Sequence, residues 1–247
     1  PDFKVTYESC SWTATQMFNF AKNNAPAIGY PFMMPESFNF NVNMSDSALN
    51  NAAACANITY IGGHIYGSKP FTYTNAINKG KKIWMTEHYY DDSTSNINIA
   101  LKVAKEIHDC MCNNMNAYCW WWMLPLNGSK CNLIDSKNAL TKNACAIGQF
   151  SKWIRPGYNR IEATANPNSN VYISAYTNGT KVVIVAINMS TVAISQPFKI
   201  QNGNISSATP YVTSGSKNIA ASSNIAVSNN GFTAILDAHS ITTLVAN

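Results

Sequence analysis

The pattern of hydrophobic and polar residues divides the chain into two parts. Up to about residue 156, short apolar runs of period two alternate with longer segments whose apolar residues recur every three or four positions. This order predicts four strand–helix units, which build a parallel sheet with right-handed crossovers. From residue 157 onward no helical period survives. We therefore predict part of an α/β domain over residues 1–156 and an antiparallel β-sandwich over residues 157–247.

Segments with a helical period fill the spaces between the predicted strands. The clearest covers residues 97–112, whose isoleucine and valine residues recur at every fourth position. Residues 11–24 also predict a helix, because Thr13 and Gln16 have the spacing of a capping box. Further helices are predicted over residues 46–56, just before residue 81, and over about 144–154.

The stretch at residues 81–90 predicts a buried strand with a carboxylate at its tip. Its side chains alternate, so Ile83, Met85 and Glu87 face one side while Trp84 faces the other. An apolar run that ends in an acid is typical of strands in α/β barrels, whose carboxyl ends form the active site. A solvated glutamate just past a strand is the alternative interpretation, and this stretch alone does not decide between the two.

The other predicted parallel strands end in similar chemistry. They cover residues 30–37, 58–67 and 117–123, and they end in Glu36, in His64 and Tyr66, and in Trp120 to Trp122. Because the carboxyl ends of parallel strands share one edge of a sheet, we expect these side chains near Glu87. Two alternatives stay open. His64 could be a hydrogen-bonded core residue, and at least one of the three tryptophans must pack in the core, because successive side chains point to opposite faces.

The second part of the chain has only β-type patterns. Strands are predicted over residues 171–177, 181–188, 198–201, 208–212, 225–227, 232–237 and 241–246. Asn178-Gly179 lies between the first two of them, and this dipeptide is a strong signal for a β-hairpin turn.

The amino-acid composition argues against a disordered chain and against nucleic acid or a membrane as a binding partner. Hydrophobic residues make up 46% of the 247 residues and charged residues only 12%, so a sizeable core is possible and disorder is not expected. The net charge of +5 comes from fifteen lysines and two arginines that form no basic run, which argues against nucleic acid. The densest apolar run, residues 118–126, is too short to span a membrane.

The sequence indicates no metal or cofactor. The seven cysteines have no zinc-binding spacing, and both disulfides and thiols stay open for them. No glycine-rich phosphate loop or serine nucleophile elbow follows any predicted strand. Six Asn-x-Ser/Thr sequons are compatible with secretion, but in a chain with 33 asparagines several arise by chance.

Carboxylates beside aromatic residues favour a carbohydrate site. The chain has only twelve acids, and Glu87 and Glu36 both fall at predicted strand tips. A glycosidase needs one carboxylate as nucleophile or base and another carboxyl group as proton donor. His64, Tyr66, Tyr89, Trp120 and Trp121 would supply ring surfaces and hydrogen bonds around them.

Four motifs resemble glycoside hydrolase family 30, in its xylanase branch. They are Trp84-Met85-Thr86-Glu87, Gly63-His64-Ile65-Tyr66-Gly67, Pro35-Glu36-Ser37-Phe38 and the run at residues 150–158. The runs at residues 170–176 and 181–188 resemble the side domain of that family. The resemblance implies a (β/α)₈ TIM barrel with an attached β-sandwich. It also implies a secreted, monomeric enzyme that cleaves β-1,4-xylan with retention of configuration and needs no cofactor.

The resemblance also implies residue roles. Glu87 would be the nucleophile, Trp120 and Trp121 would contact the sugar at the cleavage site, and His64 and Tyr66 would orient Glu87. Tyr89 would contact substrate beyond the scissile bond, and Glu36 would only support the site. The general acid/base of the family lies in an Asn-Glu-Pro motif, which Pro1-Asp2 would continue. We therefore expect barrel strands five to eight only, without the proton donor and with little activity in this chain alone.

Two alternative functions stay open: a β-glucosidase or β-1,6-glucanase of the same family, and a non-catalytic carbohydrate-binding remnant.

A narrower expectation concerns the side groups of xylan. The bacterial glucuronoxylanases that the chain resembles hold glucuronate with an arginine in the loop after the eighth strand. That position falls at or next to Pro125, and residues 1–154 contain no arginine. Lys130 offers only a point charge, so we expect no requirement for glucuronate.

Overall fold

The computed structural model describes all residues except 3–9, 92–94 and 125–130. The chain forms two compact units, one made of Pro1–Tyr89 and Asp109–Trp121, the other of Tyr90–His108 and Trp122–Asn247. The domain division that we predict at residue 156 stays a prediction.

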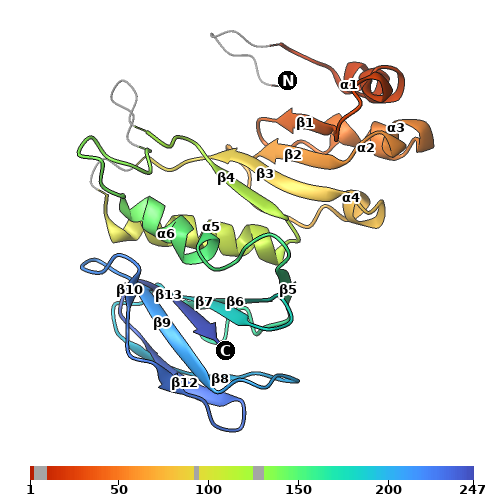
Figure 1. Ribbon diagram of the computed structural model, residues 1–247. Helices are drawn as coiled ribbons and strands as arrows, with labels where there is room; N and C mark the ends of the chain where they lie inside the picture. The colour runs from red at the N-terminus through yellow and green to blue at the C-terminus, as the bar shows by residue number, and fades with distance from the viewer. Residues whose placement is uncertain (3–9, 92–94, 125–130) are drawn as a thin grey trace. The chain divides into compact units, whose positions relative to one another are not determined.

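A parallel sheet is the centre of the first unit. Its strands are β1 (Met33–Ser37), β2 (Tyr60–His64), β3 (Lys82–His88) and β4 (Ala117–Trp120). They lie side by side in the order β1-β2-β3-β4, and every neighbouring pair is parallel (Figure 1). The prediction of four parallel strands with Glu87 near the carboxyl end of the third is confirmed.

Helices precede the first strand of this sheet and separate the later ones in sequence. The first unit contains α1 (Ala14–Asn23), the 3-10 turn η1 (Ala25–Ala27), α2 (Asn43–Leu49), α3 (Ala52–Ala56) and α4 (Thr74–Asn78). The capping box predicted at Thr13 and Gln16 is present at the start of α1. The single helix predicted over residues 46–56 is wrong. Asn51 is extended there, and its side-chain oxygen accepts a hydrogen bond from the Ala54 N–H at 3.1 Å, which starts a new helix.

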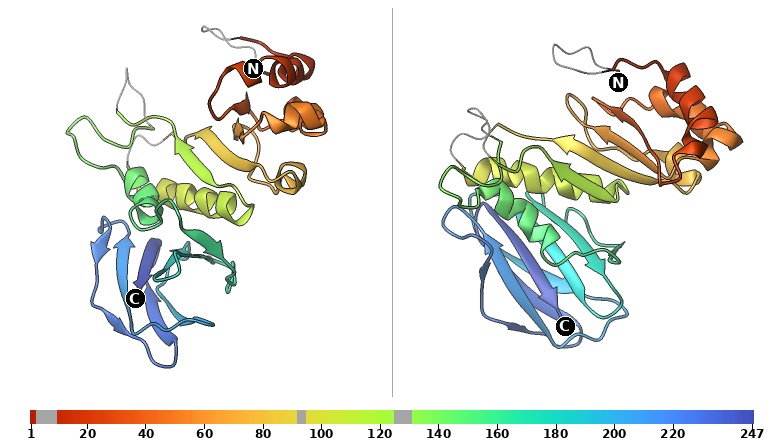
Figure 2. Two further views of the ribbon diagram at one scale, coloured as in Figure 1. Left: turned by 45° about the vertical axis from the view of Figure 1, so that its right-hand side comes forward. Right: turned by 45° about the horizontal axis from the view of Figure 1, so that its top comes forward.

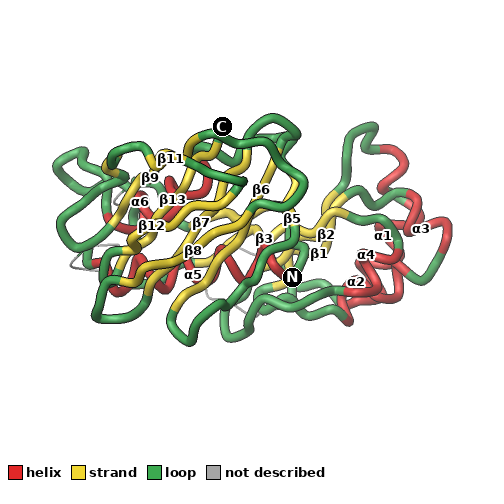
Figure 3. Tube along the Cα trace, turned by 90° about the horizontal axis from the view of Figure 1, so that it is seen from below, coloured by secondary structure: helices red, strands yellow, loops and turns green. Residues whose placement is uncertain are grey.

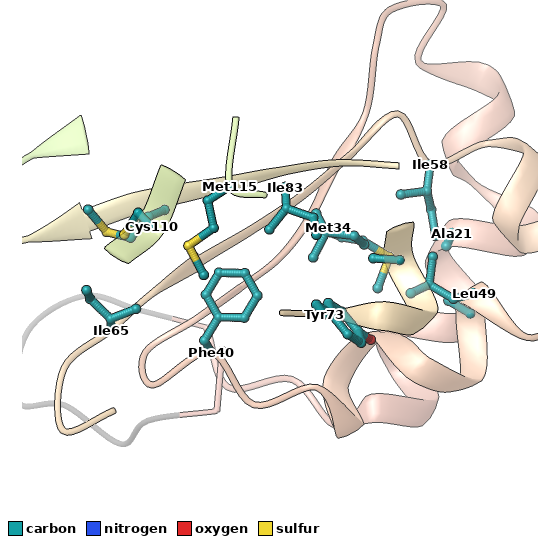
Figure 4. Close-up of a cluster of buried hydrophobic side chains, with 14 of the residues drawn as sticks. Ala21, Met34, Phe40, Leu49, Ile58, Ile65, Tyr73, Ile83, Cys110 and Met115 are labelled. Atoms are coloured by element: carbon teal, nitrogen blue, oxygen red, sulfur yellow. The ribbon is translucent and has the colours of Figure 1, made fainter. Parts of the chain in front are cut away.

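One face of the parallel sheet is apolar and packs against the helices. Met34, Ile61, Ile83 and Met85 from three strands are at most 2% exposed. They share a core with helical residues that include Ala21, Ala48, Leu49 and Cys110 (Figure 4). On this face Gly63 approaches the ring of Phe40 so closely that an added Cβ would lie 2.7 Å from it. The alternation predicted for β3 is confirmed for Ile83 and Met85.

The other face of the sheet carries polar and aromatic side chains. Tyr60 and Trp84 lie there with ring centroids 4.7 Å apart. Two residues further along each strand are Gly62 and Thr86, beside the carboxylate of Glu36. Strand periodicity therefore separates the core face from the face that leads to the candidate site.

The second unit contains α6 (Lys142–Ser151) and most of α5 (Ile97–Cys112). Helix α5 has the predicted bounds, and the boundary between the compact units falls within it, after His108. Helix α6 begins two residues before the predicted start, because the Thr141 hydroxyl accepts a hydrogen bond from the Ala144 N–H and so caps the helix. Figure 2 shows α6 against the β-sheet of this unit, where the Thr243 hydroxyl donates a hydrogen bond to the buried Gln149 carbonyl at 2.6 Å.

The strands of the second unit are antiparallel. They are β5 (Asn159–Ile161), β6 (Val171–Thr177), β7 (Val182–Asn188), β8 (Ile194–Lys199), β9 (Ser207–Thr213), β10 (Ala220–Ala221), β11 (Ile225–Ala226), β12 (Gly231–Leu236) and β13 (Ser240–Ala246). One sheet has the order β10-β9-β13-β7-β6-β5, with β11 also paired to β9, and β12 pairs with β8 separately (Figure 3). Side chains of both sheets share one apolar core.

The hairpin predicted at Asn178-Gly179 is confirmed. It joins β6 to β7, and Gly179 has a φ of +91°, a conformation that favours glycine. The Asn178 side chain accepts hydrogen bonds from the N–H groups of Thr180 and Lys181 at 3.0 and 2.9 Å. Strands β5 and β10 have only three and two residues, too few to produce a period in the sequence.

Asp2 provides a pH-dependent contact in the first unit. Its carboxylate accepts hydrogen bonds from the Ser37 hydroxyl at 2.7 Å and from the Phe38 N–H at 3.0 Å. Burial alone would raise the pKa of Asp2, but these hydrogen bonds outweigh it and hold the pKa below its usual value. A lowered folded-state pKa stabilises the fold above the unfolded pKa of about 3.9, and the contribution is lost as the pH falls through the folded value.

We therefore expect Asp2→Asn to reduce the free energy of unfolding by about 1 kcal/mol at pH 7 and by much less near pH 2. Urea unfolding followed by tryptophan fluorescence at both pH values measures the difference, with Glu162→Gln, an exposed position, as the control. An equal loss at both pH values would show that the charge of Asp2 has no part in the effect.

Candidate active site

Three ionisable side chains meet at the carboxyl ends of adjacent strands. Glu36 comes from β1, His64 from β2 and Glu87 from β3. The Nε2 atom of His64 lies 3.5 Å from Glu36 Oε2, and its Nδ1 atom lies 3.7 Å from Glu87 Oε1. The imidazole therefore lies between two carboxylates. The 3.7 Å contact is longer than a hydrogen bond, so it acts as an electrostatic contact.

Irregular strand pairing directs Glu87 toward His64. The register between β2 and β3 shifts at this point, so that Gly63 pairs with Met85 but His64 pairs with Glu87. The register between β3 and β4 also shifts between Met85 and His88. Strict alternation would send Glu87 to the core face with Met85. An extra residue in one strand changes the direction of the side chains beyond it, which explains why Glu87 contacts His64.

Glu36 is held by an unusual backbone and by two neighbours. It has a φ of +61°, in the left-handed region, where the register of β1 against β2 shifts. The Thr86 hydroxyl donates a hydrogen bond to Glu36 Oε1 at 2.9 Å. Gly62 lies directly beside the same oxygen, and an added Cβ would overlap it. The carboxylate of Glu36 therefore occupies space that only a glycine at position 62 leaves free.

The two glutamates cannot act as a glycosidase pair. In such a pair the carboxyl groups face each other across the scissile bond, and the sugar occupies the space between them. Here the ring of His64 occupies the space between Glu36 and Glu87. If one of these glutamates is a nucleophile, the other is therefore not its proton donor.

Aromatic rings gather around Tyr66, just past the end of β2. Its ring lies 5.0 Å from Phe38 with nearly parallel planes, 5.0 Å from His88, 5.6 Å from Tyr89 and 5.9 Å from His64, measured between centroids. Centroid distances of 4.5–7 Å are those of stabilising ring pairs. Tyr66 therefore connects the loops that follow β1, β2 and β3.

The tryptophans predicted for the site take different positions. Trp120 pairs with His88 at the end of β4, and the Trp121 N–H donates a hydrogen bond to the His88 carbonyl at 3.1 Å. Trp121 is 38% exposed, which leaves ring surface for a ligand. The strand predicted to reach residue 123 ends at Trp120, and the Trp122 carbonyl instead accepts a hydrogen bond from Leu133 in the second unit.

The structure thus brings together most of the residues that the sequence predicts for a site. Glu87, His64, Tyr66 and Tyr89 are linked by the contacts described above, and Trp120 and Trp121 join them through His88. Gly62, Thr86 and Cys119 also lie near Glu36 or respond to its charge, which no sequence pattern predicts. The period of β3 places Thr86 opposite the core face, but nothing in the sequence pairs it with Glu36.

Cys119 on β4 responds to the charge of Glu36. Burial raises the pKa of its thiol, and the negative charge of Glu36 raises it further. Cys119 is therefore a protonated thiol at neutral pH. The charge of Glu36 acts on β4 as well as on His64.

Among the residues that the structure describes, no three histidine, cysteine or acidic side chains gather into a possible metal site. Within the described ranges, no helix is both long enough and apolar enough to cross a membrane.

Comparisons with known proteins identify the class of the chain. No family model matches it. The chain is 39% identical over 256 residues to the glucuronoxylanase XynC of Bacillus subtilis strain 168, which covers 100% of this chain and 59% of that protein. The chain is therefore homologous to glycoside hydrolases.

Solved structures of family 30 xylanases are also similar to the chain. A family 30 endoxylanase from Clostridium papyrosolvens is 50% identical, with a TM-score of 0.89 over 96% of this chain and 61% of that one. The family 30 subfamily 8 xylanase Xyn30A from Clostridium acetobutylicum is 45% identical, with a TM-score of 0.94 over 100% of this chain and 64% of that one. The chain is homologous to family 30 xylanases, which confirms the resemblance found in the sequence. It spans only 59–64% of the length of these relatives.

The link between Glu36 and Cys119 gives a chemical test of the site. We expect Glu36→Gln to lower the pKa of Cys119 and so to speed its alkylation by iodoacetamide at pH 8, by roughly two- to fivefold. Mass spectrometry of the Cys119 peptide measures the rate, and Cys10, another exposed cysteine, is the internal control. Unchanged alkylation of Cys119, or an equal increase at Cys10, would contradict the assigned interaction.

Proposed function

We propose that this chain carries the nucleophile of a retaining glycoside hydrolase that acts on xylan, an endo-β-1,4-xylanase. The observation that carries the proposal is the position of Glu87. It lies at the carboxyl end of β3, beside His64 and the aromatic rings around Tyr66. The homologous proteins named as xylanases support the same substrate class.

In the proposed reaction, Glu87 attacks the anomeric carbon of a xylose unit and forms a glycosyl-enzyme intermediate. The leaving oxygen takes a proton from a carboxylic acid. Water then attacks the intermediate, helped by the same residue as a base, and the configuration is retained. Glu36 is unsuited to donate this proton, because His64 separates it from Glu87. In our proposal the donor lies in the part of the fold that the longer relatives have in addition.

The fold is part of the proposal. The parallel sheet β1-β2-β3-β4 would be strands five to eight of a (β/α)₈ barrel, and the antiparallel sheets would belong to a β-sandwich side domain. Two features support this view: all four strands are parallel, and their carboxyl ends bear the candidate site. The protein would be secreted and monomeric, with a polysaccharide as its partner and no cofactor.

The neighbours of Glu87 would position the sugar. The exposed ring of Trp121 and the ring of Trp120 would pack against the apolar C–H faces of the xylose unit at the cleavage site. Tyr89, held against Tyr66, would contact the unit beyond the scissile bond. His64 and Tyr66 would keep the Glu87 carboxylate oriented toward the anomeric carbon.

The first test removes the nucleophile. In the complete gene product, we expect Glu87→Gln to lower kcat on xylan by on the order of 10³-fold or more, because an amide cannot form the glycosyl ester. Reducing-sugar release measures the rate, and linkage-defined oligosaccharides separate xylan from β-glucoside or β-1,6-glucan substrates. Glu162→Gln, at an exposed position, is the control.

The 247-residue chain alone should fall short of the complete gene product by on the order of 10²–10⁴-fold, because the proton donor is not among its candidate site residues. Full activity of this chain, abolished by Glu87→Gln, would show that another acid in it supplies the proton. Xylan binding without any hydrolysis by either protein would favour a carbohydrate-binding role instead.

The second test concerns the side groups of xylan. Pro125 and Lys130, on which the sequence expectation rests, lie outside the described residues. A guanidinium grips a carboxylate through two parallel hydrogen bonds, and residues 1–154 contain no arginine. We therefore propose that the enzyme cleaves xylan with or without glucuronate, although the two relatives from Bacillus subtilis are named glucuronoxylanases.

Product analysis on glucuronoxylan and on unsubstituted xylo-oligosaccharides provides the measurement. We expect both to be cleaved at rates within about tenfold of each other. If every product carried one glucuronate at a fixed distance from its reducing end, and the bare oligomers stayed intact, this proposal would be wrong.

A further inference from the structure

Glu36 takes no chemical step in the proposed reaction, yet several features of the fold fix the position of its side chain. Its side chain is neither the nucleophile nor a possible proton donor to the bond that Glu87 attacks. Its carboxylate nevertheless lies 3.5 Å from Nε2 of His64, whereas the other ring nitrogen, Nδ1, faces Glu87. A partly exposed glutamate at a strand end would ordinarily extend into solvent.

The backbone at Glu36 is in an unfavourable conformation. A residue with a side chain at a φ of +61° is uncommon, and such conformations cost on the order of 1–3 kcal/mol when the surroundings impose them. The conformation coincides with the register shift of β1 against β2, which turns the side chain. Strain of this kind is found at functional sites, where it fixes a side chain in place.

The neighbours of the carboxylate fix it further. The Thr86 hydroxyl binds Oε1 at 2.9 Å, which leaves Oε2 to contact His64. Gly62 provides the space for the carboxylate, because a side chain there would overlap Oε1. The three features come from three strands, and all act on the same carboxyl group.

We propose that Glu36 is a positioning residue, which holds the imidazole of His64 so that Nδ1 faces the nucleophile Glu87. This inference rests on the proposed function of Glu87. The two nitrogens of an imidazole flank one carbon of a rigid ring and point in different directions, so a fixed carboxylate at Nε2 restricts the rotation of the whole ring. Nδ1 is buried and has no hydrogen-bond partner within the part of the chain that the structure describes. The polar atom found beside it is Glu87 Oε1, at 3.7 Å.

This arrangement of Glu36, His64 and Glu87 would act during the attack of Glu87 on the sugar. When Glu87 bonds to the sugar through one oxygen, the other oxygen must stay in place for the attack to follow a single direction. His64 lies beside Oε1 of Glu87 and can keep it there. Without Glu36, the ring of His64 would rotate about its side-chain bonds, and Glu87 would spend less time in the reactive orientation.

A double-mutant cycle in the complete gene product tests the inference. The proteins are the wild type, Glu36→Gln, His64→Ala and the double variant. The substrate is dinitrophenyl β-xylobioside, whose leaving group needs no protonation, and kcat is taken as the rate constant of the first turnover, so it reports the attack by Glu87. We expect Glu36→Gln to lower kcat by about tenfold with KM within about twofold, and His64→Ala to lower kcat at least as much. The double variant should be no slower than His64→Ala, because Glu36 acts through His64.

Milder variants support the cycle if one of these proteins unfolds. Thr86→Val removes the hydrogen-bond donor to Glu36, and Gly62→Ala displaces the carboxylate and also crowds Met33. Each should lower kcat in the wild-type background, and Thr86→Val should have little effect beside Glu36→Ala. Gly215→Ala is the matched control, because an added Cβ there meets nothing within 4 Å. The melting temperature of each variant separates loss of fold from loss of rate.

The outcomes distinguish this inference from the function on which it rests. If Glu36→Gln keeps the wild-type kcat while Glu87→Gln is inactive, the inference alone is wrong. The same holds if the effects of Glu36→Gln and His64→Ala multiply, since Glu36 would then act independently of His64. If Glu87→Gln is fully active, the proposed nucleophile is wrong, and the role of Glu36 is overturned with it.

Discussion

The parallel pairing of β1 to β4 is the constraint on which the candidate site depends. Because the four strands run in the same direction, residues that are distant in the sequence arrive at one edge of the sheet. The apolar residues of one face anchor that sheet to the helices, so the opposite face is free to carry polar groups. The direction of the strands thus brings the site residues together, and the individual side chains then determine its chemistry.

Two glutamates at the same edge of the sheet have different neighbours, which suit them to the different roles that we propose. Glu87 and Glu36 both lie at strand ends, and both contact His64. Glu87 is placed by irregular pairing on both sides of β3, beside aromatic rings that can contact a sugar. Glu36 lies against Thr86 and Gly62, close to His64, and its charge raises the pKa of Cys119. The roles follow from these neighbours, because the two side chains are chemically identical.

Much of this arrangement could be predicted from the sequence, because it depends on local patterns. The period of α5 sets its bounds, Thr13 and Gln16 start α1, and the apolar run before Glu87 marks β3. Register shifts between strands could not be predicted, since they depend on how neighbouring strands fit together in three dimensions. The contact between Thr86 and Glu36 follows from such a shift. Asn51 was missed for another reason: an asparagine within an alanine-rich segment fits a helix interior and a helix start equally well.

Gly62 links the evolutionary histories of two positions. Because a side chain at position 62 would overlap the carboxylate of Glu36 and approach Met33, a larger residue there requires the carboxylate to move or Glu36 to be replaced. The opposite order is open, since Glu36 can be replaced while the glycine stays. A lineage that has taken both steps cannot recover the present position of the Glu36 carboxylate by one substitution, because position 62 must also return to glycine. The order of mutations at this edge of the sheet is therefore directional, and loss of the glutamate becomes hard to reverse.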